Sequence, residues 1–67
     1  MIKVVINGEN RIIDSNLNIT QLLKELNLDI RKLAVEVNIK IIPKTDYDSI
    51  KINNGDKIEI IHLVGGG

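Results

Sequence analysis

The last three residues, Gly65, Gly66 and Gly67, are the part of this 67-residue sequence best suited to chemistry. Consecutive glycines have the greatest backbone freedom, so folding them against a domain is costly. Without Cβ atoms they could enter a narrow channel, where another protein's groups approach the backbone closely. The group they would present is the α-carboxylate of Gly67, which is unreactive until it becomes a mixed anhydride. A frayed terminus without function is the alternative interpretation.

Few other residues offer chemistry. The chain has no cysteine and a single histidine, His62, which excludes a disulfide framework, a thiolate zinc site, a cysteine nucleophile and a multi-histidine metal site. His62 has no evident catalytic partner at a telling spacing, so we interpret it as structural. Asp46, Asp48 and Asp56 do not follow the calcium-loop pattern. We therefore expect a chain that binds no cofactor or metal.

Composition narrows the possible partners. Nine basic residues balance nine acidic ones, and Tyr47 is the only aromatic residue. A neutral chain without stacking side chains is a poor nucleic-acid binder. No apolar run reaches the roughly 18–20 residues of a membrane span, and no signal-peptide pattern is present, so we expect a cytoplasmic protein without a membrane partner. Tyr47 is expected to cover one end of the core with its hydroxyl in water.

The first half of the chain predicts a hairpin and a helix. Apolar residues at every second position from Ile2 to Ile6 indicate a strand with one buried face. Asn7-Gly8 favours a type I′ turn, so a return strand is expected over residues 9–13. Asn18 and Gln21 resemble a capping box, and a helix of about ten residues is expected to follow. Its apolar stripe consists of Ile19, Leu22, Leu23 and Leu26. Asn27 suits the left-handed residue that ends a helix, after which Leu28 can fold back onto Leu23.

The second half predicts three strands. Alternating apolar residues indicate a strand over residues 33–37, and a shorter one over 39–42 that stops at Pro43. Residues 44–52 are expected to be irregular or to form one helical turn. The dense turn signal of residues 53–56 precedes a last strand over residues 57–63.

This order, β-β-α-β-β-β, predicts an α+β fold of the β-grasp type. We expect one helix packed on a mixed sheet, with the first and last strands adjacent at its centre. Residues 1–64 would form this domain, and residues 65–67 a flexible tail. On the outer sheet face, Val5, Ile61 and Leu63 would form an exposed apolar patch, which we interpret as a docking site together with Gly65. Scattered surface aliphatics without function are the alternative.

The sequence resembles the ThiS family, the ubiquitin-like sulfur carriers of thiamine synthesis. The resemblance rests on four stretches in the family's order and spacing: the opening strand with Asn7-Gly8, residues 38–43 (NIKIIP), residues 55–60 (GDKIEI) and the ending of residues 64–67 (VGGG). It covers the whole chain. A terminal Gly-Gly alone would be a weak signal.

The resemblance implies that the chain is a co-substrate and not itself an enzyme. An E1-like adenylyltransferase would use ATP and Mg²⁺ to convert the Gly67 carboxylate to an acyl-adenylate, with Gly66 completing the reactive end. A persulfide donor of the cysteine desulfurase type would displace AMP and leave a thiocarboxylate. Thiazole synthase would take the sulfur to build the thiazole ring from a deoxyxylulose phosphate and a glycine-derived imine.

Three other functions remain open on the sequence. Molybdopterin-synthesis sulfur carriers share the fold and the Gly-Gly end, but they tend to be longer and usually carry prolines before the tail, where this chain has residues 61–64 (IHLV). A ubiquitin-like tag would join Gly67 to a lysine through an isopeptide bond. A non-reactive β-grasp binding module would use the glycines as a linker.

Overall fold

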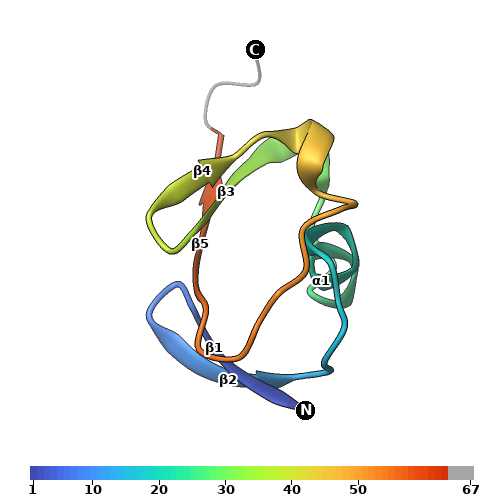
Figure 1. Ribbon diagram of the computed structural model, residues 1–67. Helices are drawn as coiled ribbons and strands as arrows, with labels where there is room; N and C mark the ends of the chain where they lie inside the picture. Colours follow the sequence, from blue (N-terminus) through green and yellow to red (C-terminus); the bar gives the residue numbers. More distant parts are fainter. Residues whose placement is uncertain (64–67) are drawn as a thin grey trace.

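The computed structural model describes residues 1–63. The elements follow the predicted order (Figure 1): β1 (Ile2–Ile6), β2 (Glu9–Ile13), α1 (Ile19–Glu25), η1 (Ile30–Lys32), β3 (Leu33–Val37), β4 (Lys40–Ile42), η2 (Lys44–Asp46) and β5 (Lys57–His62). The predicted tail of residues 65–67 lies outside the described residues. Among residues 1–63, no helix has the length and apolar character needed to cross a membrane.

The five strands form one mixed sheet in the order β2-β1-β5-β3-β4, with α1 against one face (Figure 1). β1 and β5 are parallel neighbours, whereas β1–β2, β3–β5 and β3–β4 are antiparallel. The last strand therefore fills the centre of the sheet beside the first, which confirms the predicted β-grasp architecture. Because successive side chains alternate between the faces, each strand offers one row to the helix and one to the outside.

α1 begins and ends as its sequence predicts. The Asn18 side chain accepts the N–H of Gln21 at 2.7 Å, and Gln21 returns a bond to the Asn18 backbone. At the other end Asn27 is left-handed (φ 58°), and the N–H of Leu28 donates to the Leu23 carbonyl at 3.0 Å. These bonds form a Schellman motif and satisfy carbonyls that a helix end leaves unpaired. α1 spans seven residues, fewer than the expected ten or so, because Leu26 and the left-handed Asn27 belong to the cap and not to the helix.

The β3–β4 connection differs from the expected strand start at residue 39. Asn38 and Ile39 have φ values of 52° and 74°, so they form the two-residue turn and β4 begins at Lys40. The other hairpin places Asn7 (φ 50°) and Gly8 (φ 80°) in the same roles. A left-handed conformation costs a residue with a Cβ about 1–2 kcal/mol, and β-branched isoleucine is a poor choice there. Because Ile39 is apolar, the sequence pattern predicts a strand at this position, where the structure has a turn.

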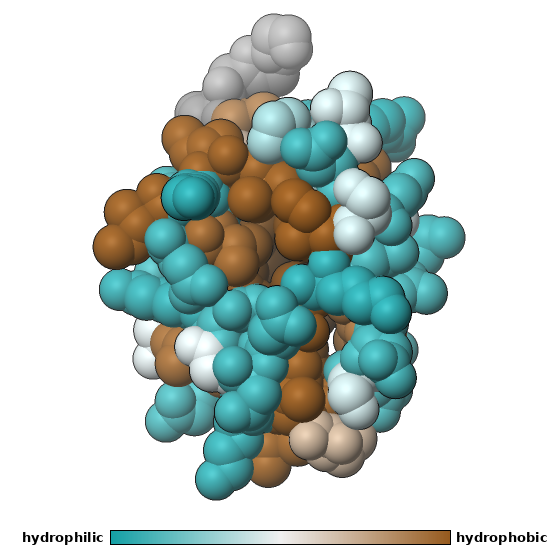
Figure 2. Space-filling view, viewed as in Figure 1, coloured by the Kyte–Doolittle hydropathy of each residue, from teal (hydrophilic) through white to brown (hydrophobic). Residues whose placement is uncertain are grey.

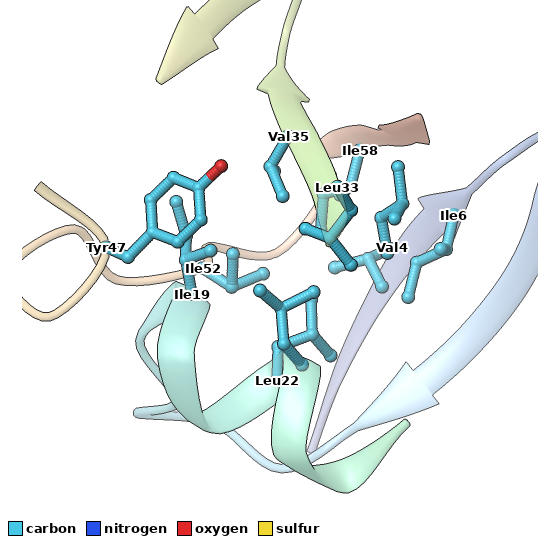
Figure 3. Packing of buried hydrophobic residues seen from close by; sticks show 11 residues of the cluster. Val4, Ile6, Ile19, Leu22, Leu33, Val35, Tyr47, Ile52 and Ile58 are labelled. Atoms are coloured by element: carbon cyan, nitrogen blue, oxygen red, sulfur yellow. The ribbon is translucent and has the colours of Figure 1, made fainter. Parts of the chain in front are cut away.

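The core lies between the inner sheet face and α1 (Figure 3). It joins the inward rows of β1, β3 and β5 to the apolar stripe of the helix. Its largest fully buried side chains are Tyr47, Ile19, Leu22, Leu23, Leu33, Ile58 and Val35. Tyr47 is 1% exposed, so the prediction that its hydroxyl would face water is wrong. Its aromatic ring closes one end of a core that otherwise consists of aliphatic side chains.

Burial of Tyr47 predicts a loss of stability at alkaline pH. Desolvation raises the pKa of Tyr47 above its ordinary value of 10.0, and the Val35 backbone partly opposes the shift. The folded state thus holds the phenol proton more tightly than the unfolded state. The stabilisation is complete below the unfolded pKa and is lost as pH rises through the folded pKa. Thermal unfolding followed by circular dichroism should show Tm falling above about pH 10. Tyr47→Phe should lessen this fall, and an unchanged alkaline slope in that variant would contradict the assignment.

Candidate functional site

The candidate site lies at the end of β5, the strand that leads toward the terminal glycines. β5 runs between β1 and β3 (Figure 1). Its last residue, His62, lies opposite Leu33 of β3. One residue later, the N–H of Leu63 donates to the carbonyl of Lys32 at 2.9 Å. The chain is therefore bonded to its neighbour as far as Leu63.

The Asn7 side chain continues the hydrogen bonding of β5 beyond the end of β1. The parallel pairing stops at Ile6 and Ile58. Asn7 Oδ1 then accepts the N–H of Ile60 at 2.7 Å, and Asn7 Nδ2 donates to the Ile60 carbonyl at 3.3 Å. These bonds satisfy backbone groups that β1 is too short to reach. The sequence predicts Asn7 as a turn residue but does not predict this second role.

A second turn asparagine, Asn38, holds the other end of β5. Asn38 Oδ1 accepts the N–H of Lys57 at 2.9 Å, and Asn38 Nδ2 donates to Asp56 Oδ1 at 3.0 Å. The other carboxylate oxygen of Asp56 accepts the N–H of Asn53 at 2.8 Å. Asp56 is the one buried charged side chain among residues 1–63, and amide donors satisfy both of its oxygens. The turns on either side of β5 thus fix the position of the strand.

A local ion pair shapes the turn that receives the end of β5. Arg31 Nη2 lies 2.9 Å from Asp29 Oδ2, and the backbone N–H of Arg31 donates to Asp29 Oδ1 at 3.0 Å. The side-chain hydrogen bond from Arg31 is the main cause that lowers the pKa of Asp29 to about 2, with the backbone bond second. Asp29 caps η1, whose last residue, Lys32, accepts the bond from Leu63. The Asp29 carboxylate is therefore ionised at neutral pH, and it caps the turn whose Lys32 carbonyl bonds to Leu63.

The structure separates the three residues expected to form one apolar patch. Ile61 and Leu63 are exposed near the end of β5. Val5 is half-buried and lies opposite Lys57, four positions before Ile61, which is about 13 Å along the strand. Glu59 lies between Lys57 and Ile61 on the same face. A continuous patch that includes Val5 is therefore not formed. Whether each residue contacts a partner stays a prediction.

The other predicted site residues are His62 and the three terminal glycines. His62 is exposed at the end of β5. No group of three or more His, Cys, Asp or Glu side chains that could hold a metal ion forms within residues 1–63. Gly65, Gly66 and Gly67 lie outside the described residues, so their predicted roles stay predictions.

Other features of the outer face were not predicted. Ile39 and Ile41 are strongly exposed on the β3–β4 hairpin, and Glu36 lies directly opposite Glu59. The sequence signal for the first of these is an Asn-Ile pair where a two-residue turn favours Asn-Gly. The signal becomes visible only when β3 and β4 are known to be joined by two residues.

Comparisons with known proteins agree with this geometry. A family model described as the ThiS family matches residues 4–67. The sulfur carrier protein ThiS of Bacillus subtilis is 41% identical over 49 residues, which cover 73% of this chain and 74% of that protein. The crystal structure of the thiamine biosynthesis protein ThiS from Geobacter metallireducens superposes with a TM-score of 0.86 at 28% identity, covering 98% of this chain and 100% of that one.

A longer relative contains a stretch that is similar to this chain. A thiazole synthase of Paramagnetospirillum magneticum is 48% identical over 65 residues, or 97% of this chain. This chain spans only 20% of the length of that relative.

Proposed function

The chain belongs to the ThiS family, the small sulfur carriers of thiamine biosynthesis, and on this premise we propose that Gly67 carries the sulfur as a C-terminal thiocarboxylate. The observation that carries the proposal is the family match, which extends through Gly67. As a carrier, the chain takes part in the reaction as a protein co-substrate and leaves catalysis to its partners.

The proposed chemistry begins with activation of the carboxylate. A Gly67 carboxylate oxygen attacks the α-phosphorus of ATP on an E1-like adenylyltransferase, with Mg²⁺ on the nucleotide, and pyrophosphate leaves. The product is an acyl-adenylate, a mixed anhydride. A nucleophile can attack its acyl carbon, whereas the free carboxylate resists such attack. No side chain of the carrier is needed for this step, in keeping with the absence of cysteine from the sequence.

Sulfur then enters from a persulfide. The terminal sulfur of a persulfide, formed by a donor of the cysteine desulfurase type, attacks the acyl carbon, and AMP leaves. A thiol cleaves the resulting acyl disulfide, so that a disulfide forms and the thiocarboxylate is released on Gly67. The balance requires one thiol as the reductant in each cycle.

The proposed acceptor of the sulfur is thiazole synthase. Two relatives with that name, each about five times as long as this chain, contain a stretch similar to it. This similarity supports a link between carrier and synthase. Ile61 and Leu63 are proposed to contact the adenylyltransferase and thiazole synthase, because both side chains are exposed next to the last hydrogen bond of β5. Gly66 and Gly65 would pass through the enzyme's channel behind Gly67.

The experiment that tests the proposal is sulfur loading followed by intact mass spectrometry. The purified chain is incubated with an E1-like adenylyltransferase, Mg-ATP, a cysteine desulfurase with cysteine, and a thiol. The expected product is heavier than the starting protein by the mass difference between one sulfur and one oxygen. Reactions without ATP, or without the desulfurase, should show no such shift.

Transfer to a synthase distinguishes the pathways. The loaded chain should lose its sulfur to thiazole synthase with its two small substrates and form the thiazole product. Exclusive transfer to molybdopterin synthase would contradict the thiamine assignment. Conjugation to lysine side chains instead of sulfur loading would contradict the carrier function itself.

A further inference from the structure

The Asn7 side chain acts as one additional residue of β1. Its Oδ1 accepts the N–H of Ile60 at 2.7 Å, and its Nδ2 donates to the carbonyl of the same residue at 3.3 Å. The backbone N–H of Asn7 donates to the Ile58 carbonyl at 2.9 Å, so main chain and side chain bond to alternate residues of β5. An amide side chain offers the same donor and acceptor as a peptide group. The hydrogen bonding on the β1 side of β5 therefore continues to Ile60, although β1 has already turned toward β2.

The turn by itself does not require these bonds. Asn7 has a φ of 50°, which glycine adopts at no steric cost, and its side chain reaches a residue 53 positions later in the sequence. Figure 2 shows hydrophobic side chains gathered in the upper part of the view, where β3, β4 and the end of β5 lie in Figure 1. The two bonds are part-buried, so water would replace the side-chain amide only poorly. Asn7 therefore has a role in β5 that is separate from its role in the turn.

These bonds lie close to the proposed reactive end of the chain. Leu63 follows Ile60 by three positions, and its N–H donates to the Lys32 carbonyl at 2.9 Å. The end of β5 is thus held from the β1 side at Ile60 and from the β3 side at Leu63. Gly67 is the fourth residue after Leu63, and a chain of that length spans at most about 13–14 Å. Because the connection is so short, the direction of the strand end limits where the carboxylate can go.

We propose that Asn7 is a positioning residue for the adenylation of Gly67, because it holds the end of β5 in the direction that brings the carboxylate to the α-phosphorus of ATP. This inference rests on the proposed function, since it concerns the same carboxylate. Misplacement of reacting groups by 1 Å can cost about 100-fold in rate. Without the Asn7 side chain, the part of β5 beyond Ile58 would be bonded only on the β3 side within residues 1–63. The enzyme would then have to order the strand end before reaction, which lowers the rate of the chemical step.

The chain contains a matched control in Asn38. This residue is also the first of a two-residue turn, has a φ of 52°, and accepts an N–H of β5, that of Lys57, on its Oδ1 at 2.9 Å. Lys57 is the first residue of β5, six positions before Leu63. Asn38 Nδ2 also donates to the buried carboxylate of Asp56. Loss of the Asn38 side chain should therefore reduce stability at least as much as loss of the Asn7 side chain, but it leaves the end of β5 bonded.

The test measures adenylation by ATP–pyrophosphate exchange on an E1-like adenylyltransferase, with the concentration of the carrier varied. Asn7→Gly and Asn38→Gly are compared, because glycine keeps the left-handed turn and removes only the side chain. Asn7→Gly should lower kcat about tenfold, the effect of ordering about one backbone residue, and should leave KM within about twofold. Asn38→Gly should keep kcat and KM close to the wild-type values although its Tm falls at least as far. All assays are run below the lowest Tm, so that every variant is folded.

Two further measurements distinguish positioning from general damage to the fold. Asn7→Asp keeps an oxygen that accepts the Ile60 N–H but lacks the amide donor, so its kcat should lie between those of the wild type and Asn7→Gly. Amide hydrogen exchange reports how firmly each end of β5 is bonded. Exchange at Ile60 and Leu63 should be faster in Asn7→Gly, with exchange at Lys57 unchanged. Asn38→Gly should show the reverse pattern.

The outcomes separate this inference from the proposed function. If the wild type is adenylated and Asn7→Gly has the same kcat, the inference fails and the carrier function stands. The same conclusion follows if both glycine variants lose kcat in proportion to their loss of Tm, because Asn7 would then have a structural role alone. A change confined to KM would also overturn the inference, since Asn7 would then act in docking. If the wild type is never adenylated, the proposed function fails and this inference fails with it.

Discussion

Deletion of Gly67 is expected to abolish sulfur loading and to leave the folded domain unchanged. The deletion moves the carboxylate back by one residue, about 3.3–3.6 Å along an extended chain. Since a 1 Å misplacement of reacting groups can cost about 100-fold in rate, loading should fall by at least about 100-fold. The contacts of residues 1–63 are untouched, so the thermal transition should coincide with that of the wild type. Intact mass and calorimetry measure the two effects.

A chain of full length with an amidated C-terminus is the matched control for the deletion. It keeps the length of the tail and removes only the reacting carboxylate. It should still bind the adenylating enzyme but accept no sulfur. Loading of either modified chain would show that another group carries the sulfur.

Replacing Ile58 by alanine is expected to have the largest effect on stability. Its side chain is 0% exposed and belongs to the core between the sheet and α1. Substitutions of this kind cost about 2–5 kcal/mol, the sum of lost burial and the cavity left behind. Folded domains have only about 5–15 kcal/mol in total, and small ones lie near the lower end. Urea denaturation should show a large shift of the midpoint, with part of the population unfolded in buffer.

Ile61→Ala is the matched control on the same strand. Ile61 is 44% exposed on the opposite face, and surface substitutions usually change stability by no more than about 0.5 kcal/mol. The pair therefore tests the alternation of β5 directly. A stability loss for Ile61→Ala as large as that for Ile58→Ala would place both side chains in the core and contradict the register.

The sequence predicts the architecture well because its local signals agree. The Asn7-Gly8 turn, the capping box of Asn18 with Gln21, and the left-handed Asn27 each depend on residues within a few positions of one another. Local geometry of this kind can be inferred from residue type and spacing. The position of β5 beside β1 followed from the apolar character of the last strand and the single crossover helix.

The arrangement of the outer face could not be predicted in the same way. Val5 and Ile61 share a face, but their separation depends on the register between β1 and β5, which local spacing does not determine. Tyr47 is buried because its own segment is bonded to the distant start of α1, where the N–H of Thr20 donates to the Tyr47 carbonyl at 3.2 Å. The second role of Asn7 arises because the pairing of β1 with β5 ends at Ile58, so the backbone groups of Ile60 must bond to the Asn7 side chain instead. Each of these depends on contacts between distant segments.

The central place of β5 also determines when the carrier becomes recognisable. Its partners β1 and β3 are synthesised well before it, and β1 cannot gain its parallel neighbour until residues 57–62 are available. Contacts between such distant segments form late, because the loop between them must close first. Ile61, Glu59 and the strand end at Leu63 are all supplied by this last segment. An unfinished or locally unfolded chain therefore lacks both the exposed Ile61 and the hydrogen-bonded strand end at Leu63. A partner that contacts both features would bind only carriers whose folding is complete.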